Sequence, residues 1–342
     1  MRDLLNDIAA QPEAMLANAP VLQDAFERLP RLIGARGRTV ITGVATSLWA
    51  WHGADLLLQR AGMEQRLIDC SEYLRYGRIE QDDRPLLITS RSGESAEIVA
   101  LLEQPSAQRT IIGMTASAKS TLAKKSSDAF CIAADEQAFY NTKSFTLTIC
   151  LTIASAGGII GSAAFDPKNW LENAAQKTLE IVKNQPPALN RIGQMLAQSR
   201  LAIIVARGPL IGVANQVSLD LQEGMRIGAQ SIPGGLLRHG PIELSQCPDA
   251  CLVLLIQNDH MTSTMLKLAA DLKAWGARVA AVVTKGITLP ANIPVVEVPQ
   301  ADPYISQILF AVALQHINVA TATAMGLKSI QPTLVPKITS IE

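Results

Sequence analysis

The sequence has no excess of charge of either sign, because its 30 lysine and arginine residues balance its 30 aspartate and glutamate residues. Proteins that bind nucleic acid or an anionic membrane surface concentrate basic residues in one patch. Neither kind of partner is therefore expected. A small neutral or singly anionic ligand fits this composition better.

The sequence also lacks long hydrophobic runs and a signal peptide. No apolar run reaches the ~20 residues of a membrane-spanning helix. The first residues, Met-Arg-Asp-Leu-Leu-Asn-Asp, include acids where a signal peptide has basic residues and then an apolar block. We therefore predict a cytoplasmic protein without a membrane partner.

Signals for metals and cofactors are missing as well. The five cysteines are an odd number at no metal-ligand spacing, and most lie in apolar runs, so we expect free thiols. His52, His260 and His316 have no partners at metal-ligand spacing. No glycine-rich dinucleotide fingerprint follows the first strand of either half, which argues against NAD. We predict that the protein uses no metal and no cofactor.

What the sequence does have is an alternation of short β-branched apolar runs with longer segments of helical period. Hydrophobic residues make up 48% of the 342 residues, which is enough for a substantial core, and a chain of this length predicts two domains. The alternation is typical of an α/β fold with a parallel sheet covered on both faces. We expect strands near residues 39–42, 66–70, 85–89, 109–114, 129–133, 201–205, 250–256 and 278–284. We expect helices near residues 144–160, 211–228, 261–275 and 304–320.

The pattern occurs twice, which predicts two tandem doubly wound domains that arose by duplication and then diverged. Pro167 and the pair Pro186-Pro187 bracket a helical connector with a charged face. The predicted divisions are an N-terminal helical segment at 1–30, a first domain at 31–165, a helical linker at 166–190, a second domain at 191–330, and a C-terminal tail at 331–342.

Residues 85–95, Pro-Leu-Leu-Ile-Thr-Ser-Arg-Ser-Gly-Glu-Ser, have the organisation of a phosphate site. A buried strand leads to a tight turn, and the next helix points unpaired N–H groups and its positive dipole end at an anion. Ser90, Ser92 and Ser95 add hydroxyl donors, while Gly93 allows close backbone approach. An ordinary strand–turn–helix connection would look the same. The second half has Gln257–Met261 in the corresponding place, so we expect one phosphate site per chain.

A second group of polar residues lies near the middle of the second half. At helical spacing, Gln216, Asp220 and Glu223 share one face. The stretch 231–237 is small, apolar and flexible, which suits the lining of a cleft, and it leads to His239. A carboxylate and an imidazole in one cleft can act as general base and acid beside a carbonyl. A solvated helix face and a turn histidine are the structural alternative, which spacing alone favours.

Further motifs accompany these two groups over nearly the full length. Taken together, they resemble the tandem SIS (sugar isomerase) domain proteins, most closely the isomerase half of glutamine–fructose-6-phosphate transaminases, and also fructosamine-6-phosphate deglycases and amino-sugar-phosphate deaminases. The similar segments are Ala45-Thr46-Ser47, Ser71-Glu72-Tyr73, Ser90 to Ser95, Glu136, Asn141 to Thr146, Arg207-Gly208, Leu221-Gln222-Glu223, Arg238 to Pro241, and Gln331-Pro332 through Lys337 to Glu342.

The resemblance implies a role for each matching position. In the first half, Ser90, Ser92 and Ser95 would hold the phosphate of a sugar. Thr46 and Ser47 would complete this part of the site near the sugar hydroxyls. Two further residues, Glu136 and Asn141, would contact substrate.

In the second half, Glu223 falls on the family's enolisation base, which moves a proton between C1 and C2 of an open-chain sugar. His239 falls on the ring-opening histidine, which the family contributes across a homodimer interface. Lys337 falls on a lysine that can form a Schiff base with a ketose. That amine must be partly neutral near pH 7, which requires burial or a nearby cation. The resemblance thus implies that the tail closes over the site.

Two positions depart from the family pattern. Asp220 and Gln216 stand where the family has a lysine and a second glutamate that handle sugar hydroxyls, and they remain candidate substrate contacts. A carboxylate at 220 is expected to raise the pKa of Glu223 by like-charge repulsion. The chain begins directly with the isomerase-like part, so we do not expect it to make glucosamine 6-phosphate from glutamine by itself.

These features predict an enzyme that acts on an aminated hexose 6-phosphate in the degradative direction. We favour cleavage of a fructosamine 6-phosphate by a deglycase. The alternative within the family is an amino-sugar-6-phosphate deaminase and isomerase. A non-catalytic sugar-phosphate-binding regulator is the alternative from another class, although such regulators usually carry an additional DNA-binding domain.

Overall fold

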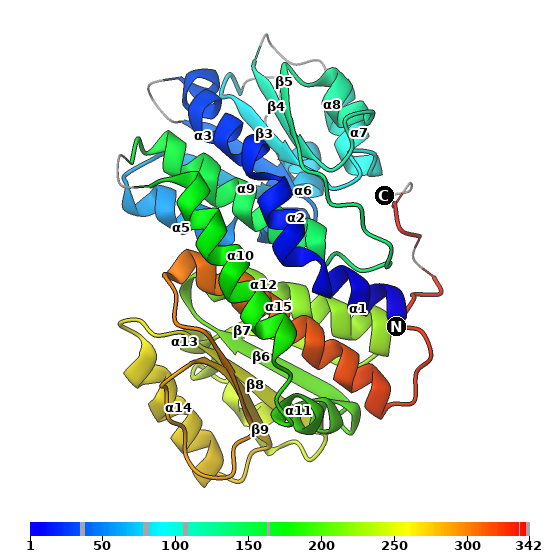
Figure 1. The fold of residues 1–342 in the computed structure, drawn as a ribbon, viewed down its shortest axis with the longest axis vertical. Coiled ribbons are helices and arrows are strands. Elements are labelled where there is room, and N and C mark those ends of the chain that lie inside the picture. Colours follow the sequence, from blue (N-terminus) through cyan, green and yellow to red (C-terminus); the bar gives the residue numbers. More distant parts are fainter. Residues whose placement is uncertain (35–37, 78–81, 105–108, 163–164, 335, 340–342) are drawn as a thin grey trace. The chain divides into compact units, whose positions relative to one another are not determined.

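The computed structural model describes residues 1–342 except 35–37, 78–81, 105–108, 163–164, 335 and 340–342. The chain folds into two compact units. Unit A comprises Ala10–Ala175 and Thr333–Glu342, and unit B comprises Met1–Ala9 and Gln176–Pro332. The division falls within helix α10 (Pro167–Lys183). Figure 1 shows the elements of each unit with their labels.

Unit A is built on a five-stranded parallel sheet with the strand order β2-β1-β3-β4-β5. Its strands are β1 (Thr39–Gly43), β2 (Gln65–Asp69), β3 (Leu86–Thr89), β4 (Ile111–Thr115) and β5 (Asp128–Cys131). Its helices are α2 (Gln11–Ala17), α3 (Ala19–Ile33), α4 (Thr46–Trp49), α5 (His52–Arg60), α6 (Cys70–Tyr76), α7 (Ala96–Glu103), α8 (Thr121–Lys125) and α9 (Lys143–Ile159).

Unit B is built on a second five-stranded parallel sheet with the order β7-β6-β8-β9-β10. Its strands are β6 (Leu201–Ala206), β7 (Gly228–Pro233), β8 (Ala250–Ile256), β9 (Val279–Thr284) and β10 (Val295–Val298). Its helices are α1 (Arg2–Ala9), α11 (Ala188–Ala197), α12 (Ile211–Asp220), the π-helical turn η3 (Leu221–Met225), α13 (Gly234–Leu237), α14 (Thr262–Ala274) and α15 (Pro303–Ala324).

The two sheets have the same topology. In each, the second strand of the unit lies at one edge, followed in space by the first, third, fourth and fifth strands. The central strands are buried along their whole length, as β1 and β8 illustrate, because helices cover both faces of a parallel sheet. The predicted tandem doubly wound α/β fold is therefore confirmed. In this strand order a ligand binds beyond the carboxyl ends of the first and third strands, where the chain direction of the crossovers reverses.

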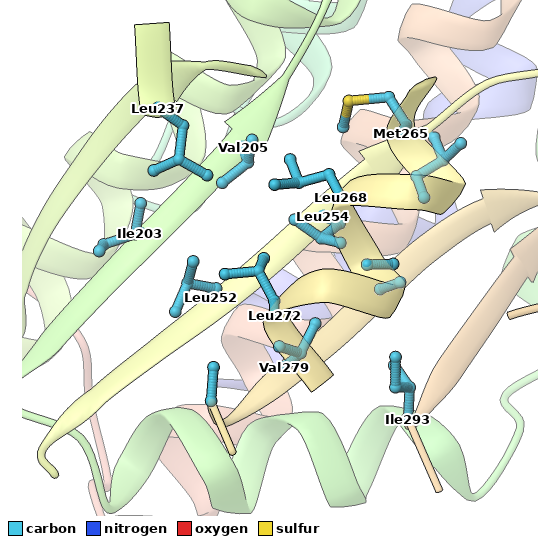
Figure 2. Packing of buried hydrophobic residues seen from close by; sticks show 14 of the residues in the cluster. Ile203, Val205, Leu237, Leu252, Leu254, Met265, Leu268, Leu272, Val279 and Ile293 are labelled. Atoms are coloured by element: carbon cyan, nitrogen blue, oxygen red, sulfur yellow. The ribbon is translucent and has the colours of Figure 1, made fainter. Parts of the chain in front are cut away.

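The core on one face of the second sheet follows from the two-residue period of its strands. Figure 2 shows Leu252 and Leu254 of β8 facing Leu268 and Leu272 of α14, with Val279 of β9 beside them. All five side chains are at most 4% exposed. Burial of each leucine stabilises the fold by roughly 2 kcal/mol.

The segment at 231–237 differs from its prediction as a flexible cleft lining. It forms the end of β7 and the short helix α13 instead. Ile232 and Leu237 are 2% and 0% exposed and belong to the core of unit B. The expected flexibility was therefore wrong, because the segment is regular secondary structure anchored by these two side chains, whereas Leu236 is 54% exposed. The helix predicted at 211–228 also ends earlier, with η3 followed by Arg226 in the left-handed region at φ 54°.

Helix α15 corrects the expectation about apolar runs. Among the described residues, it is the one helix long and apolar enough to cross a membrane by length and composition, with a mean hydropathy of 1.4 over its most apolar window. Asp302 caps its first turn, and the helix continues past the predicted end to Ala324. The expectation that no run reaches this length was therefore wrong. However, 89% of that window is buried inside the fold, as in a core helix.

Candidate functional site

The loop after β3 contains Ser90, Ser92 and Ser95, whose hydroxyl groups can donate hydrogen bonds. The Gly93 N–H donates to Ser90 Oγ at 3.1 Å, and the Glu94 N–H donates to Ser92 Oγ at 3.2 Å. Each of these hydroxyls thus accepts a bond from the turn and keeps its own O–H as a donor. Ser95 is the residue before α7, and its side chain makes no capping bond. No acceptor among the described residues takes the backbone N–H groups of Ser92 and Ser95.

The loop is held in place by the segment that follows β4. The Arg91 carbonyl accepts hydrogen bonds from Thr115 Oγ1 at 3.1 Å and from the Ala116 N–H at 2.9 Å. Gly93 has φ +66°, and a Cβ there would lie 2.4 Å from Ser120 Oγ. Glycine is therefore required both by the backbone conformation and by the closeness of the Ser120 side chain.

The turn after β1 lies beside this loop. A Cβ at Gly43 would lie 2.7 Å from the Thr89 carbonyl oxygen, so the ends of β1 and β3 approach closely. Asn141 Nδ2 donates to Thr46 Oγ1 at 3.2 Å, while the Ser47 N–H donates to the Val44 carbonyl. The predicted residues Thr46, Ser47, Ser90, Ser92, Ser95 and Asn141 therefore all belong to unit A, at the carboxyl edge of its sheet.

Arg91, Glu136 and Asn141 form a polar cluster against the same loop. Arg91 Nη1 donates to Asn141 Oδ1 at 2.9 Å, and its Nε lies 3.3 Å from Glu136 Oε2. The Glu136 side chain is 1% exposed and accepts bonds from the backbone and hydroxyl of Thr142 and Ser144. Burial raises the pKa of Glu136, and the Arg91 charge opposes this rise. Glu136 is thus fully engaged in positioning Arg91 and the start of α9.

Sequence reasoning did not single out Arg91 as a site residue. The signal was present, because an arginine in the middle of a predicted phosphate loop is a natural anion-binding residue. The Arg91 side chain extends from the serine loop, and its guanidinium contacts Asn141 and Glu136 while the side chain stays 26% exposed. It therefore adds a cation to a loop that already offers N–H and O–H donors.

The described part of the tail contacts the serine loop within unit A. The Ala96 N–H, the first of helix α7, donates to the Thr339 carbonyl at 3.0 Å. Lys337 Nζ donates to the Ala138 carbonyl at 2.6 Å. Lys337 is exposed in this structure, whereas the Schiff-base role that the resemblance implies needs burial or a neighbouring cation.

The two candidate acid–base residues belong to unit B. Glu223 lies in the turn η3, where burial raises the pKa of its carboxyl above the usual value. His239 follows α13 and is exposed, and its backbone N–H donates to the Leu236 carbonyl at 2.9 Å. No hydrogen bond within the described part of unit B joins the two side chains.

Gln216 and Asp220 bond to each other in the interior of unit B. Gln216 Nε2 donates to Asp220 Oδ1 at 2.7 Å, and Asn318 Nδ2 of α15 donates to Asp220 Oδ2 at 3.1 Å. Both predicted residues are at most 6% exposed. The pKa of Glu223 is raised as expected, but the cause is its own burial and not repulsion by Asp220.

Metal sites and disulfides can be assessed for the described residues. No group of three or more His, Cys, Asp or Glu side chains there could hold a metal ion. All five cysteines are free thiols.

Two parallel sheets with the same strand order, the first with a hydroxyl-rich loop at its switch point, define a tandem doubly wound α/β protein. Residues 75–156 match the family described as the SIS domain.

The similar curated proteins are longer than this chain. One is the isomerizing glutamine–fructose-6-phosphate aminotransferase of Pyrobaculum aerophilum, 24% identical over 347 residues, which cover 99% of this chain and 57% of the relative. The enzyme of that name from Rhizobium meliloti is 25% identical over 332 residues, covering 93% of this chain and 53% of the relative. The chain thus spans a little more than half the length of these relatives.

Solved structures with this fold cover nearly the whole chain. The C-terminal domain of glucosamine-fructose-6-phosphate aminotransferase from Francisella tularensis has a TM-score of 0.82 at 21% identity, covering 96% of this chain and 98% of that one. Glucosamine-6-phosphate deaminase from Thermotoga maritima has a TM-score of 0.77 at 16% identity, covering 98% and 99%. The predicted resemblance to tandem SIS proteins is therefore confirmed, and at these identities the likeness shows the fold.

Proposed function

We propose that this protein is an enzyme that binds the phosphate of a hexose or amino-sugar 6-phosphate and transfers a proton between C1 and C2 of the sugar. The observation that carries the proposal is the serine loop at the switch point of the first sheet. Its hydroxyls and N–H groups retain donors, which suits a phosphate. The relatives support the same chemistry, because their names specify fructose 6-phosphate and glucosamine 6-phosphate.

In this proposal the phosphate oxygens accept hydrogen bonds from Ser90, Ser92 and Ser95, with Thr46 and Ser47 beside them. The positive end of the α7 dipole adds to the attraction. The tail can yield a further donor, since the Ala96 N–H is occupied by the Thr339 carbonyl and becomes available when the tail moves away.

Glu223 is the proposed base for the proton at C1. Burial raises the pKa of this carboxyl, which brings its basicity closer to the operating pH and makes it a stronger proton acceptor. His239 is the proposed acid for ring opening, supplied by the second subunit of a homodimer. Lys337 is the proposed amine for a Schiff base, once it has released the Ala138 carbonyl.

The favoured reaction is deglycation of a fructosamine 6-phosphate. Removal of the C1 proton by Glu223 gives a 1,2-enaminol, and return of a proton to C2 gives an imine at C1. Water then adds to C1 and the C–N bond breaks, releasing an aldose 6-phosphate and the free amine. Asp220 and Gln216 support a reaction unlike that of the glutamine–fructose-6-phosphate transaminases, because they bond to each other and leave the family's lysine and glutamate roles unfilled.

Deglycation of a large amine needs a site that is open on one side, and the small residues Gly234 and Gly235 could have provided such an opening, but the structure gives no support for it. Their neighbour is the Arg207 side chain, which a Cβ at Gly234 would approach to 3.1 Å. An amino-sugar-6-phosphate deaminase and isomerase therefore remains the second candidate, favoured by the fold shared with the Thermotoga maritima deaminase.

The test uses the full chain with fructose 6-phosphate, glucosamine 6-phosphate and a fructosamine 6-phosphate. Hexose phosphate, ammonia and primary amine are measured separately. If the protein is a deglycase, it should release the amine from the fructosamine substrate and should release no ammonia from glucosamine 6-phosphate. The reverse result would establish the deaminase.

A variant pair locates the base. Glu223→Gln should reduce kcat by at least about 100-fold while the substrate still binds, because general-base catalysis contributes 10²–10⁴ in rate. Glu243→Gln, at an exposed glutamate of unit B, should leave kcat unchanged. Binding of all three phosphosugars without turnover in the unmodified protein would instead make the chain a regulator.

A further inference from the structure

Arg91 lies between Ser90 and Ser92 in the serine loop, and the protein uses only part of its guanidinium. Nη1 donates to Asn141 Oδ1 at 2.9 Å, and Nε lies 3.3 Å from Glu136 Oε2. Nη2 reaches the surface and has no acceptor among the described residues. Since a guanidinium has five N–H donors, accessible donors remain for a ligand.

The contacts of Arg91 place its guanidinium at the switch point of the first sheet. Its backbone is fixed, because the Arg91 carbonyl accepts hydrogen bonds from Thr115 Oγ1 and from the Ala116 N–H. Asn141 contacts the guanidinium through its Oδ1 and Thr46 Oγ1 through its Nδ2. Arg91 belongs to the loop after β3, and Thr46 begins α4 after β1. One amide group therefore joins the guanidinium to the other turn of the proposed phosphate site.

Two carboxylates near the serine loop are engaged by other donors. Glu136 accepts hydrogen bonds from two backbone N–H groups and a hydroxyl at the start of α9, in addition to its contact with Arg91. Glu94 accepts hydrogen bonds from the N–H and the hydroxyl of Thr121 at the start of α8. Because the charge of Glu136 is shared among these donors, it does not fully cancel the charge of Arg91.

A charged donor and a neutral donor respond differently to the charge of a ligand. The N–H and O–H groups of the serine loop can bond to any oxyanion. The attraction of a guanidinium, in contrast, grows in proportion to the charge of the ligand. A phosphate monoester carries nearly two negative charges at pH 8, because its second pKa is about 6, whereas a sulfate monoester carries one.

We propose that Arg91 makes the serine loop selective for a dianionic phosphate ester over a monoanionic ester of the same sugar. Arg91 Nη2 donates to a phosphate oxygen, and the hydroxyls of Ser90 and Ser92 bind the oxyanion whatever its charge. Glu136 and Asn141 hold the guanidinium in position. This inference rests on the proposed function and assigns the selection of the ester group to one side chain.

The test compares glucose 6-phosphate with glucose 6-sulfate, each titrated into the full-length protein at pH 8 and followed by calorimetry. The unmodified protein should bind the phosphate ester at least about 30-fold more tightly than the sulfate ester. Arg91→Gln should weaken binding of the phosphate ester by at least about tenfold and of the sulfate ester by less than about threefold. Equal weakening of both esters would mean that Arg91 only shapes the loop, and would overturn the proposal.

Further variants separate the charge of Arg91 from its packing. Arg91→Lys keeps the cation and should preserve the ratio of the two affinities within about threefold. Asn141→Asp keeps the arginine but sets a carboxylate against it, so the ratio should fall at least about threefold; an unchanged ratio contradicts the proposal even if Arg91→Gln does not fold. Arg38→Gln, at an exposed arginine that precedes β1, should change neither affinity.

Ser95→Ala distinguishes failure of this inference from failure of the proposed function. The Ser95 hydroxyl is neutral, so its loss should weaken binding of both esters by similar factors. If the unmodified protein binds neither ester, the serine loop is not a sugar-ester site and both proposals fail. If both esters bind and Ser95→Ala weakens them, but the ratio does not depend on Arg91, the selectivity proposal alone fails.

Discussion

Gly93 sets the conformation of the serine loop, and its replacement gives the first prediction. Alanine at 93 combines a left-handed backbone with a Cβ only 2.4 Å from Ser120 Oγ. Gly93→Ala should therefore lower the free energy of unfolding by about 3 kcal/mol, of which roughly 1–2 kcal/mol is the backbone cost. Gly62→Ala is the matched control, because Gly62 has φ +76° and no atom within 4 Å of the added Cβ. Urea unfolding of both variants measures the difference, and equal losses would show that Ser120 moves away freely.

Arg91 gives a prediction about pH. Arg91→Met removes the cation beside the buried Glu136 and should lower the free energy of unfolding by about 2 kcal/mol at pH 8, less than for a fully buried pair because Arg91 is 26% exposed. Burial already raises the pKa of Glu136, and Arg91 opposes the rise, so the variant's pKa is higher still. When folding raises the pKa of a carboxyl group, the folded state binds the proton more tightly than the unfolded state. This group's contribution to the free energy of unfolding is fully present below the unfolded-state pKa, and it is lost as the pH rises through the folded-state pKa.

The loss in free energy of unfolding caused by Arg91→Met should therefore be small near pH 4 and grow toward pH 8. Urea unfolding at several pH values measures it. Arg38→Met is the control, since the exposed pair of Arg38 with Glu64 should contribute less than about 1 kcal/mol. A deficit that is the same at every pH would mean that Arg91 acts by packing and not by charge.

The serine loop could be predicted from sequence because its chemistry is local. A strand, a glycine turn and three hydroxyls within eleven residues specify it without reference to the rest of the chain. The cluster of Arg91 and Asn141 could not be derived in this way. Fifty residues separate the two side chains, and only the fold brings them together. The hydrogen bonds of Gln216 and Asp220 to each other and to Asn318 could not be predicted either, because Asn318 lies 98 residues from Asp220 in the sequence.

At the scale of elements, all five strands of the first sheet and the three central strands of the second could be predicted, whereas the edge strands of the second sheet, β7 and β10, could not. β1, β3, β6 and β8 are apolar runs with a clear boundary. β7, Gly-Ala-Gln-Ser-Ile-Pro, contains glycine, proline and polar residues, and it is a strand because it pairs with β6 from Leu201 to Ala206. β10 has only four residues and forms the other edge. Such strands depend on long-range pairing, which the periodicity of one segment does not contain.

Gly158 of α9 provides a prediction at the element scale, since it allows α9 to pack closely on α3. A Cβ at this position would lie 2.1 Å from the Phe26 carbonyl oxygen of α3. An alanine within a helix is normally worth about 1 kcal/mol more than glycine. Gly158→Ala should nevertheless destabilise the protein by about 2 kcal/mol, because a backbone oxygen cannot move aside as a side chain can.

The control for this prediction is Gly235→Ala in α13, whose added Cβ would meet its nearest atom at an ordinary 3.5 Å. Its midpoint of thermal unfolding should stay within about 2 °C of the unmodified protein. Unit B has a similar close contact between helices, because a Cβ at Gly193 of α11 would lie 2.7 Å from Ala320 of α15. If Gly158→Ala were as stable as Gly235→Ala, the close packing of α3 on α9 would not be required.

At the scale of the whole molecule, the proposed sharing of residues between subunits can be tested by complementation. Glu223→Gln and His239→Asn should each inactivate the protein alone. In a mixed dimer, one site would combine both substitutions and the other would have an unmodified Glu223 from one subunit with an unmodified His239 from its partner. Since random exchange makes half of the dimers mixed, with one active site of two, the mixture should recover about a quarter of the unmodified activity.

Subunit exchange is achieved by mixing the variants, unfolding them together in urea and refolding them, and turnover of the preferred phosphosugar is then measured. A mixture of Glu223→Gln with Ser95→Ala distinguishes which residues are shared. Ser95 is in unit A and Glu223 in unit B. Recovery in this second mixture would mean that the phosphate loop and the base of one active site come from different subunits. If neither mixture recovers activity, each site is complete within one chain, and the exposed imidazole of His239 has no role across an interface.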